Sequence, residues 1–135
     1  MGFDTSPIIH FIESNPKYDE SLLEIFERID LKQMTGVTST ITLCEVLVHP
    51  LSGNNFTLYS QYCDLLLGND SFTTVSITPG VAQQAAGIRA RYGFRTPDAL
   101  QVAVAIQAGC QAFLTGDRRL SRVTEIRVIL LDEIG

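Results

Sequence analysis

Apolar and polar positions along this chain fall into two kinds of block. Short runs rich in β-branched or other apolar residues, typical of strands, occupy residues 2–5, 37–39, 72–77, 111–115 and 127–131. Between them, apolar side chains recur every three or four residues, as Leu22, Phe26 and Ile29 do, which places them on one face of a helix. The pattern therefore predicts strands that alternate with helical segments.

Capping residues and prolines set the predicted helix boundaries. A small polar residue followed by proline is typical of a helix start, and it occurs at Ser6–Pro7, Asn15–Pro16 and Thr96–Pro97. We expect Gly36 to close the second helix and Pro50 to stop the third. The predicted helices carry residues 8–12, 22–29, 40–48, 55–67, 79–92 and 99–108.

This order of elements predicts an α/β fold. Strands separated by helices of ten or more residues pair in parallel, because parallel strands need long crossover connections. With 135 residues and 45% hydrophobic content, the chain can bury one sizeable core. We therefore expect residues 1–135 to form a single domain with a mostly parallel sheet of four to five short strands and helices on both faces.

Composition points to a cytoplasmic protein. No apolar run approaches the roughly 20 residues of a membrane-spanning helix, and the N-terminus lacks the features of a secretory signal. Cys44, Cys63 and Cys110 are odd in number and have apolar neighbours, which favours buried, reduced thiols.

The net charge of −5 at first disfavours a nucleic-acid partner, but the charge is unevenly placed. Residues 1–67 hold nine acids and three bases, a net of −6, whereas residues 68–135 hold six acids and seven arginines, a net of +1. Arginine is suited to phosphate oxygens because its planar guanidinium donates two parallel hydrogen bonds. The second half of the chain therefore remains compatible with a phosphate-containing partner.

Four acids stand alone in apolar or turn-forming stretches at or after the predicted strand ends: Asp4, Glu45, Asp98 and Asp117. In open parallel sheets the functional crevice lies at the carboxyl ends of the strands, so these side chains are expected to meet there. Several carboxylates in one place repel one another unless a cation is present, and oxygen ligands suit Mg²⁺ or Mn²⁺. The sequence predicts an acidic, metal-holding pocket.

The four acids differ in how easily a structural role would explain them. Asp98 falls in the first turn of a predicted helix, where an acid is stabilised by the helix dipole without any function. Glu45 instead interrupts the apolar stretch from Ile41 to Val48, where a buried, unpaired carboxylate would be costly. Glu45 is thus expected to be the hardest of the four to explain structurally.

These acids lie in segments that resemble the motifs of PIN-domain nucleases, in particular the VapC-like toxins of bacterial and archaeal toxin–antitoxin pairs. The resemblance covers nearly the whole chain, with the motifs in order and at the usual spacing. The similar segments are Asp4-Thr5-Ser6, Ile41-Thr42-Leu43-Cys44-Glu45-Val46-Leu47, Thr96-Pro97-Asp98-Ala99-Leu100 and Phe113-Leu114-Thr115-Gly116-Asp117-Arg118-Arg119-Leu120.

The resemblance implies an endoribonuclease that depends on Mg²⁺ or Mn²⁺ and cleaves phosphodiester bonds of RNA. Asp4, Asp98 and Asp117 would hold the metal, with Glu45 as a ligand or acting through water. The hydroxyls of Ser6 and Thr115 would orient the carboxylates, and Arg118, Arg119 or Arg89 would hold phosphate. The resemblance also implies a VapB-like antitoxin partner and a homodimer. The helices near Leu22 to Ile29 and Phe56 to Tyr62 are candidates for such contacts, and packing on the sheet is the alternative role for both.

Two other classes of acidic α/β domain require residues that this chain lacks. A phosphatase of the haloacid dehalogenase type requires an acid where Ser6 stands, and a response-regulator receiver requires a lysine near its last strands, whereas no lysine follows Lys32. Two alternatives stay open: a catalytically idle PIN-like module that acts through protein contacts, and a PIN nuclease of RNA processing that is not a toxin.

Overall fold

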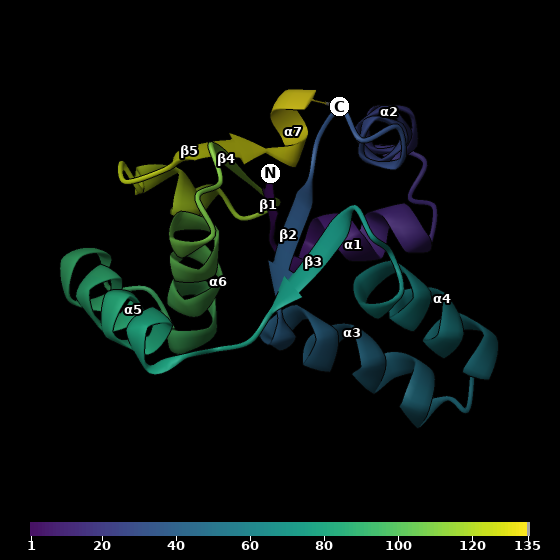
Figure 1. Cartoon of the computed structure of the whole chain (residues 1–135), viewed down its shortest axis with the longest axis horizontal. Coiled ribbons are helices and arrows are strands. Elements are labelled where there is room, and N and C mark those ends of the chain that lie inside the picture. The colour runs from purple at the N-terminus through teal and green to yellow at the C-terminus, as the bar shows by residue number, and fades with distance from the viewer. Residues whose placement is uncertain (135) are drawn as a thin grey trace.

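Five parallel strands form one central sheet in the computed structural model, which describes residues 1–134 (Figure 1). Their order across the sheet is β3-β2-β1-β4-β5, and each neighbouring pair is parallel. The predicted α/β fold is therefore confirmed. The strands are β1 (Gly2–Phe3), β2 (Gly36–Ser39), β3 (Phe72–Val75), β4 (Ala112–Thr115) and β5 (Arg127–Leu130).

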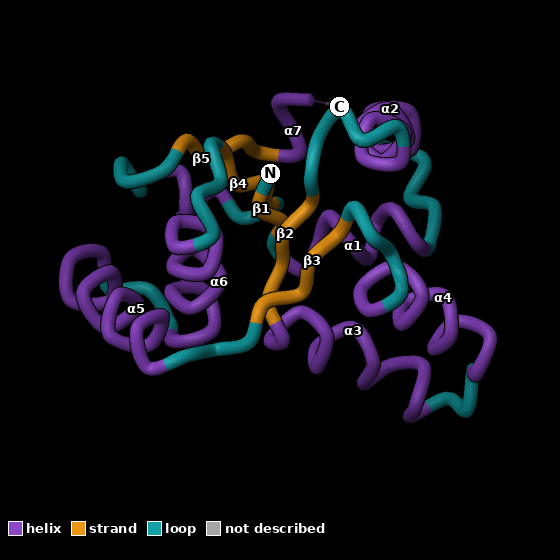
Figure 2. Tube along the Cα trace, in the orientation of Figure 1, coloured by secondary structure: helices purple, strands orange, loops and turns teal. Residues whose placement is uncertain are grey.

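Helices cover both faces of this sheet (Figures 1 and 2). One face carries α1 (Thr5–Ile12), α2 (Asp19–Asp30), α3 (Thr40–Ser52) and α4 (Phe56–Leu67), and the other carries α5 (Pro79–Tyr92) and α6 (Thr96–Gln107). The 3₁₀ helix η1 (Arg118–Arg122) precedes β5, and α7 (Leu131–Ile134) follows it. The strand order reverses at β1, so the carboxyl ends of β1 and β4 meet where crevices form in such sheets.

Each face of the sheet buries its own apolar core, because successive residues of a strand point to opposite sides. In β4, Phe113 packs into the core under α5 and α6, whereas Leu114 packs with Phe3 into the core under α1, α2 and α4. Gly2 lies against α6, where a Cβ would be 2.6 Å from the Cβ of Ala105. Glycine at this position therefore lets α6 pack closely on β1.

Three predicted boundaries between residues 15 and 50 are wrong. α3 continues through Pro50, because proline in the last turns removes only one helical hydrogen bond, and Pro50 is buried. α2 begins at Asp19, since the side chain of Asn15 accepts a hydrogen bond from the Lys17 backbone and forms a turn instead of a helix start. Gly36 starts β2 and does not close α2.

The outer side of α3 carries exposed apolar side chains. Cys44 lies on that side, so the prediction of three buried thiols is wrong for this residue, while all three cysteines are free as predicted. Val48 and Leu51 are also more than half exposed. Among residues 1–134, no helix is both long enough and apolar enough to cross a membrane.

Candidate functional site

The four acids predicted to meet line one cavity of about 520 Å³. It opens at the switch point, beyond the carboxyl ends of β1 and β4. Its wall is formed by Asp4, Thr5, Ser6, Ile9, His10, Tyr18, Glu45, Pro97, Asp98, Gln101, Gly116, Asp117, Arg118 and Leu131. Segments far apart in the sequence thus assemble one acidic site.

Asp4 directly follows β1 and caps α1. One carboxylate oxygen, Oδ1, accepts a hydrogen bond from the backbone N–H of Thr5 at 2.8 Å, and Oδ2 accepts one from Thr115 Oγ1 at 2.7 Å. Burial raises the pKa of Asp4; the hydrogen bonds from Thr115 and Thr5 lower it, and the nearby charges of Asp98 and Glu45 raise it again, leaving it above its ordinary value. Asp4, and not the predicted Ser6, is therefore the N-cap of α1.

Thr115, at the end of β4, orients two of the acids. Its fully buried hydroxyl donates to Asp4 and accepts from the backbone N–H of Asp117 at 3.0 Å. Ser6, the other hydroxyl residue predicted to orient the carboxylates, lines the cavity, but within residues 1–134 its hydroxyl forms no hydrogen bond to a carboxylate. Thr5 fills that place, donating from Oγ1 to Glu45 Oε1 at 2.7 Å.

Glu45 is exposed, so the prediction that it sits in a buried apolar segment is wrong. α3 buries only the side that carries Thr42, Val46 and Pro50, spaced four residues apart, and Glu45 lies beside that stripe. Its carboxylate reaches the cavity from the solvent side, where it accepts the hydrogen bond from Thr5. Because the Glu45 carboxylate stays in contact with solvent, it needs no buried partner to offset lost hydration.

Asp98 lies in the first turn of α6 and is largely enclosed. Its side chain is 17% exposed, and its Oδ2 atom is buried with no hydrogen-bond partner. The nearest cationic atoms are Arg119 Nη2 at 3.7 Å and Arg95 Nε at 3.9 Å. A buried carboxylate oxygen without a partner is rare in folded proteins and calls for a bound group or a function.

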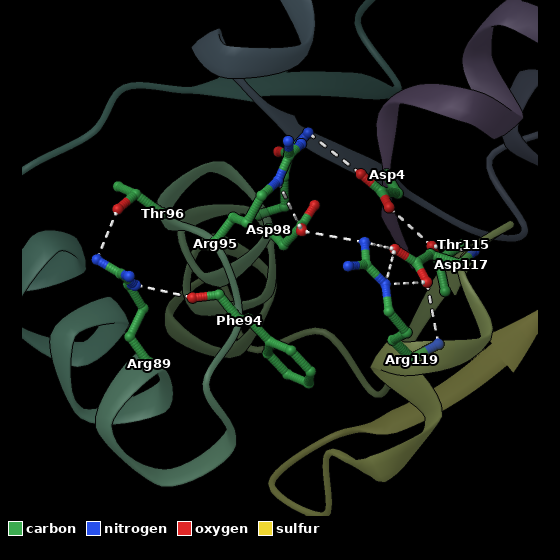
Figure 3. A network of polar contacts seen from close by, with 10 residues as sticks. Asp4, Arg89, Phe94, Arg95, Thr96, Asp98, Thr115, Asp117 and Arg119 are labelled. Atoms are coloured by element: carbon green, nitrogen blue, oxygen red, sulfur yellow. Dashed lines mark hydrogen bonds and ion pairs between the residues drawn. The ribbon is translucent and has the colours of Figure 1, made fainter.

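Asp117 precedes η1 and is held by Arg119 (Figure 3). Oδ1 accepts from the Arg119 backbone N–H at 2.9 Å, and the guanidinium contacts Oδ2 through Nη2 at 2.6 Å. The hydrogen bonds from the Arg119 side chain lower the pKa of Asp117. Since the same guanidinium faces Asp98, Arg119 lies as a positive charge between two of the four acids.

The three arginines predicted to hold phosphate lie in three different environments. Arg118 lines the cavity, and its Nη2 lies 3.4 Å from Asp132 Oδ2. Arg119 contacts the acids directly. Arg89 lies outside the cavity, where its guanidinium donates to the Phe94 carbonyl at 2.8 Å and to Thr96 Oγ1 at 3.1 Å (Figure 3).

Gln101, Thr5 and His10 line the cavity but were not among the residues predicted to act there. Gln101 falls one helical turn after Asp98, so its i+3 spacing was a signal for a shared helix face. His10 is bound by Asn15, with Nδ1 and Nδ2 of the two residues 3.0 Å apart. No local pattern distinguishes His10 from an ordinary helix residue.

The acids fit a divalent cation by their chemistry more than by their spacing. Across residues 1–134, no three His, Cys, Asp or Glu side chains are grouped tightly enough to hold an ion. The guanidinium of Arg119 contacts both Asp98 and Asp117. The donors are nevertheless hard oxygens, and the unpartnered Asp98 oxygen is one that a cation would satisfy.

Comparisons with known proteins identify the fold and the family. No curated protein sequence matches the chain. Among solved structures, the fold is similar to a toxin-antitoxin complex from Klebsiella pneumoniae, with 18% identity, a TM-score of 0.71, and coverage of 96% of this chain and 95% of that chain. It is also similar to VapBC2 from Rickettsia felis bound to a DNA fragment from their promoter, with 14% identity, a TM-score of 0.75, and coverage of 95% and 96%.

At these identities the structural likeness shows a shared fold. The sequence pattern that describes the PIN domain matches residues 1–126, and all four acids fall within that range. This match covers far more than half of the chain, so the protein belongs to the PIN domain family.

Proposed function

We propose that this protein is a divalent-metal-dependent endoribonuclease and the VapC-like toxin of a toxin–antitoxin pair. The observation that carries the proposal is the meeting of four carboxylates around one cavity, with a buried Asp98 oxygen that has no hydrogen-bond partner. Membership of the PIN domain family supports nuclease chemistry. Mg²⁺ or Mn²⁺ is the cofactor that suits such oxygen donors.

The residues that would hold the metal are Asp4, Asp98 and Asp117, with Glu45 at the solvent side. A bound divalent ion supplies a lowered pKa for water and stabilises negative charge on phosphate. Thr115 fixes the direction of Asp4 through its 2.7 Å hydrogen bond. A preformed orientation of this kind reduces the reorganisation that ion binding requires.

Arg118 is the residue we expect to contact the RNA backbone. Its side chain is 74% exposed at the cavity wall, and its contact with Asp132 is long and solvated. A pair of this kind contributes little stability and exchanges readily for a phosphate. Bound cations would also offset the acidity of the chain, which otherwise opposes RNA binding.

An antitoxin and a second copy of the chain are the partners we propose. The two similar structures bear the names of toxin–antitoxin assemblies, which motivates the first of them. Two helices were suggested for such contacts. In α2 the residues Leu22, Phe26 and Ile29 are buried in the core, so this face of the helix is not available to a partner protein. Phe56, at the start of α4, is 63% exposed and remains available for a partner.

The proposal is tested by incubating the purified protein with a pool of RNA and Mn²⁺ or Mg²⁺, with and without chelator. We expect cleavage that stops in chelator and falls strongly in Asp98→Asn and Asp4→Asn. An Asp64→Asn variant is the matched control, because Asp64 is exposed on α4, outside the cavity.

The outcomes separate the remaining functions. Cleavage that persists in chelator or in both variants would refute the metal mechanism. No cleavage under any condition would favour an idle module. Cleavage without growth arrest when the protein is expressed in the cytoplasm of a bacterial cell would favour a nuclease of RNA processing.

A further inference from the structure

A buried amide, Gln101, connects two of the acids that surround the cavity. Gln101 lies on α6 and is 3% exposed. Its side chain contacts three hydroxyl groups and, more distantly, Asp4 Oδ1 at 3.5 Å. A polar side chain this deeply buried requires a structural or functional reason, because its desolvation is costly.

The direction of the amide is set by Ser39, the buried N-cap of α3. Ser39 Oγ accepts a hydrogen bond from the backbone N–H of Ile41 at 3.1 Å, so its own hydrogen is free to go to Gln101 Oε1, 2.5 Å away. The amide nitrogen of Gln101 therefore points the other way. It donates to Thr42 Oγ1 at 2.7 Å and to Thr5 Oγ1 at 3.0 Å.

This arrangement fixes the hydrogen of Thr5 as well. A hydroxyl that accepts from an amide still has one hydrogen to donate. For Thr5 the acceptor is Glu45 Oε1 at 2.7 Å. The hydrogen bonds thus run in one direction, from Ser39 through Gln101 and Thr5 to Glu45.

We propose that Gln101 is a positioning residue that, through Thr5, holds the Glu45 carboxylate over the acidic cavity. The inference rests on the proposed function only in giving Glu45 a role at that cavity. Glu45 is exposed and has three rotatable side-chain bonds, so without this contact its carboxylate would sample several rotamers. Directed hydrogen bonds from a buried scaffold confine it.

Four variants test the proposal. Thr5→Val keeps the shape of the side chain and removes the hydroxyl, and Gln101→Met keeps its approximate length and removes the amide. Thr5→Ser restores the hydroxyl. Thr42→Val is the matched control, because Thr42 also accepts from Gln101 and lies 3.2 Å from Thr5 Oγ1, but among residues 1–134 it forms no hydrogen bond to Glu45.

The first measurement does not depend on cleavage. NMR scalar couplings of the Glu45 side chain in the metal-free protein are expected to report one dominant rotamer in the wild type, in Thr5→Ser and in Thr42→Val. They are expected to become averaged in Thr5→Val and Gln101→Met. Averaged couplings in the wild type, or unchanged couplings in both variants, would overturn the proposal whether or not the protein cleaves RNA.

The second measurement is RNA cleavage in Mn²⁺. Loss of a group that orients a ligand typically costs about 10- to 100-fold in activity or metal affinity, so we expect kcat to fall by that factor in Thr5→Val and Gln101→Met. In a Glu45→Gln background, Thr5→Val should cause almost no further loss. Fully multiplicative losses, or an equal loss in Thr42→Val, would show a merely structural role.

Discussion

Replacing Asp4 with asparagine is expected to stabilise the metal-free protein while removing its response to metal. Asp4 is largely enclosed, and Asp98 and Glu45 add negative charge nearby, which is why its pKa is raised. A raised pKa means that the ionised form is less favourable in the folded chain than in the unfolded chain. At neutral pH the carboxylate therefore lowers the free energy of unfolding.

The size of the effect follows from two opposing contributions. Enclosing a carboxylate costs several kcal/mol, and its two charge-assisted hydrogen bonds, from Thr5 and Thr115, each return about 1.5–3 kcal/mol. Asparagine keeps an acceptor for Thr5 and removes the charge, but it presents an N–H donor to Thr115, whose hydroxyl then has to accept. We expect a net gain of about 1 kcal/mol, which raises Tm by roughly 3–5 °C for a domain of this size.

The assay is thermal unfolding of both proteins in chelator and in Mn²⁺. In chelator the variant should melt at the higher temperature, whereas Mn²⁺ at about 100 times Kd should add about 2.7 kcal/mol to the wild type alone and reverse the order. The advantage of the variant in chelator should vanish as the pH falls below about 3.9, where Asp4 is protonated in both states. A variant that melts below the wild type in chelator, or that gains as much from Mn²⁺, would refute this reasoning.

Three further predictions concern other parts of the molecule. Arg119→Ala should tighten Mn²⁺ binding by about two- to fivefold in titration calorimetry, because the guanidinium no longer competes for Asp98 and Asp117; an unchanged Kd would contradict this. Gly2→Ala should lower the urea-derived free energy of unfolding by about 1–3 kcal/mol, because its Cβ would meet Ala105; wild-type stability would show that α6 can shift freely. Hydrogen bonds from Tyr18 and Lys17 lower the pKa of Asp132, so its stabilising contribution should be present at neutral pH and disappear on acidification through that pKa. Asp132→Asn should therefore show a weaker loss of Tm on acidification than the wild type, and parallel curves would exclude the effect.

The sequence predicted which acids meet but ranked their environments in the wrong order. Strand ends and motif order were sufficient to bring Asp4, Glu45, Asp98 and Asp117 to one cavity, since parallel strands align their carboxyl ends. Apolar neighbours made Glu45 look buried, yet it is exposed, because a helix buries one stripe only. The helix dipole was expected to explain Asp98, but its Oδ2 atom is buried without a hydrogen-bond partner.

The contacts that sequence alone could not provide are those between side chains on different elements. In the sequence, Gln101 looks like any other residue of a buried helix. Its proposed positioning role depends on hydroxyl groups from α1 and α3, to which it donates hydrogen bonds. Arg119 was expected to hold phosphate, and its position between two acids depends on the path of η1. Local patterns fix the period of an element, whereas these contacts depend on how elements pack.

The place of β1 at the centre of the sheet has a consequence for the timing of activity during protein synthesis. Gly2 and Phe3 are made more than a hundred residues before their partner strand β4, and Thr115 arrives with β4. Until β4 leaves the ribosome, Asp4 lacks the hydrogen bond from Thr115, and Asp117 is absent from the cavity. We therefore expect the proposed RNA cleavage to be absent from a growing chain until β4 has been made.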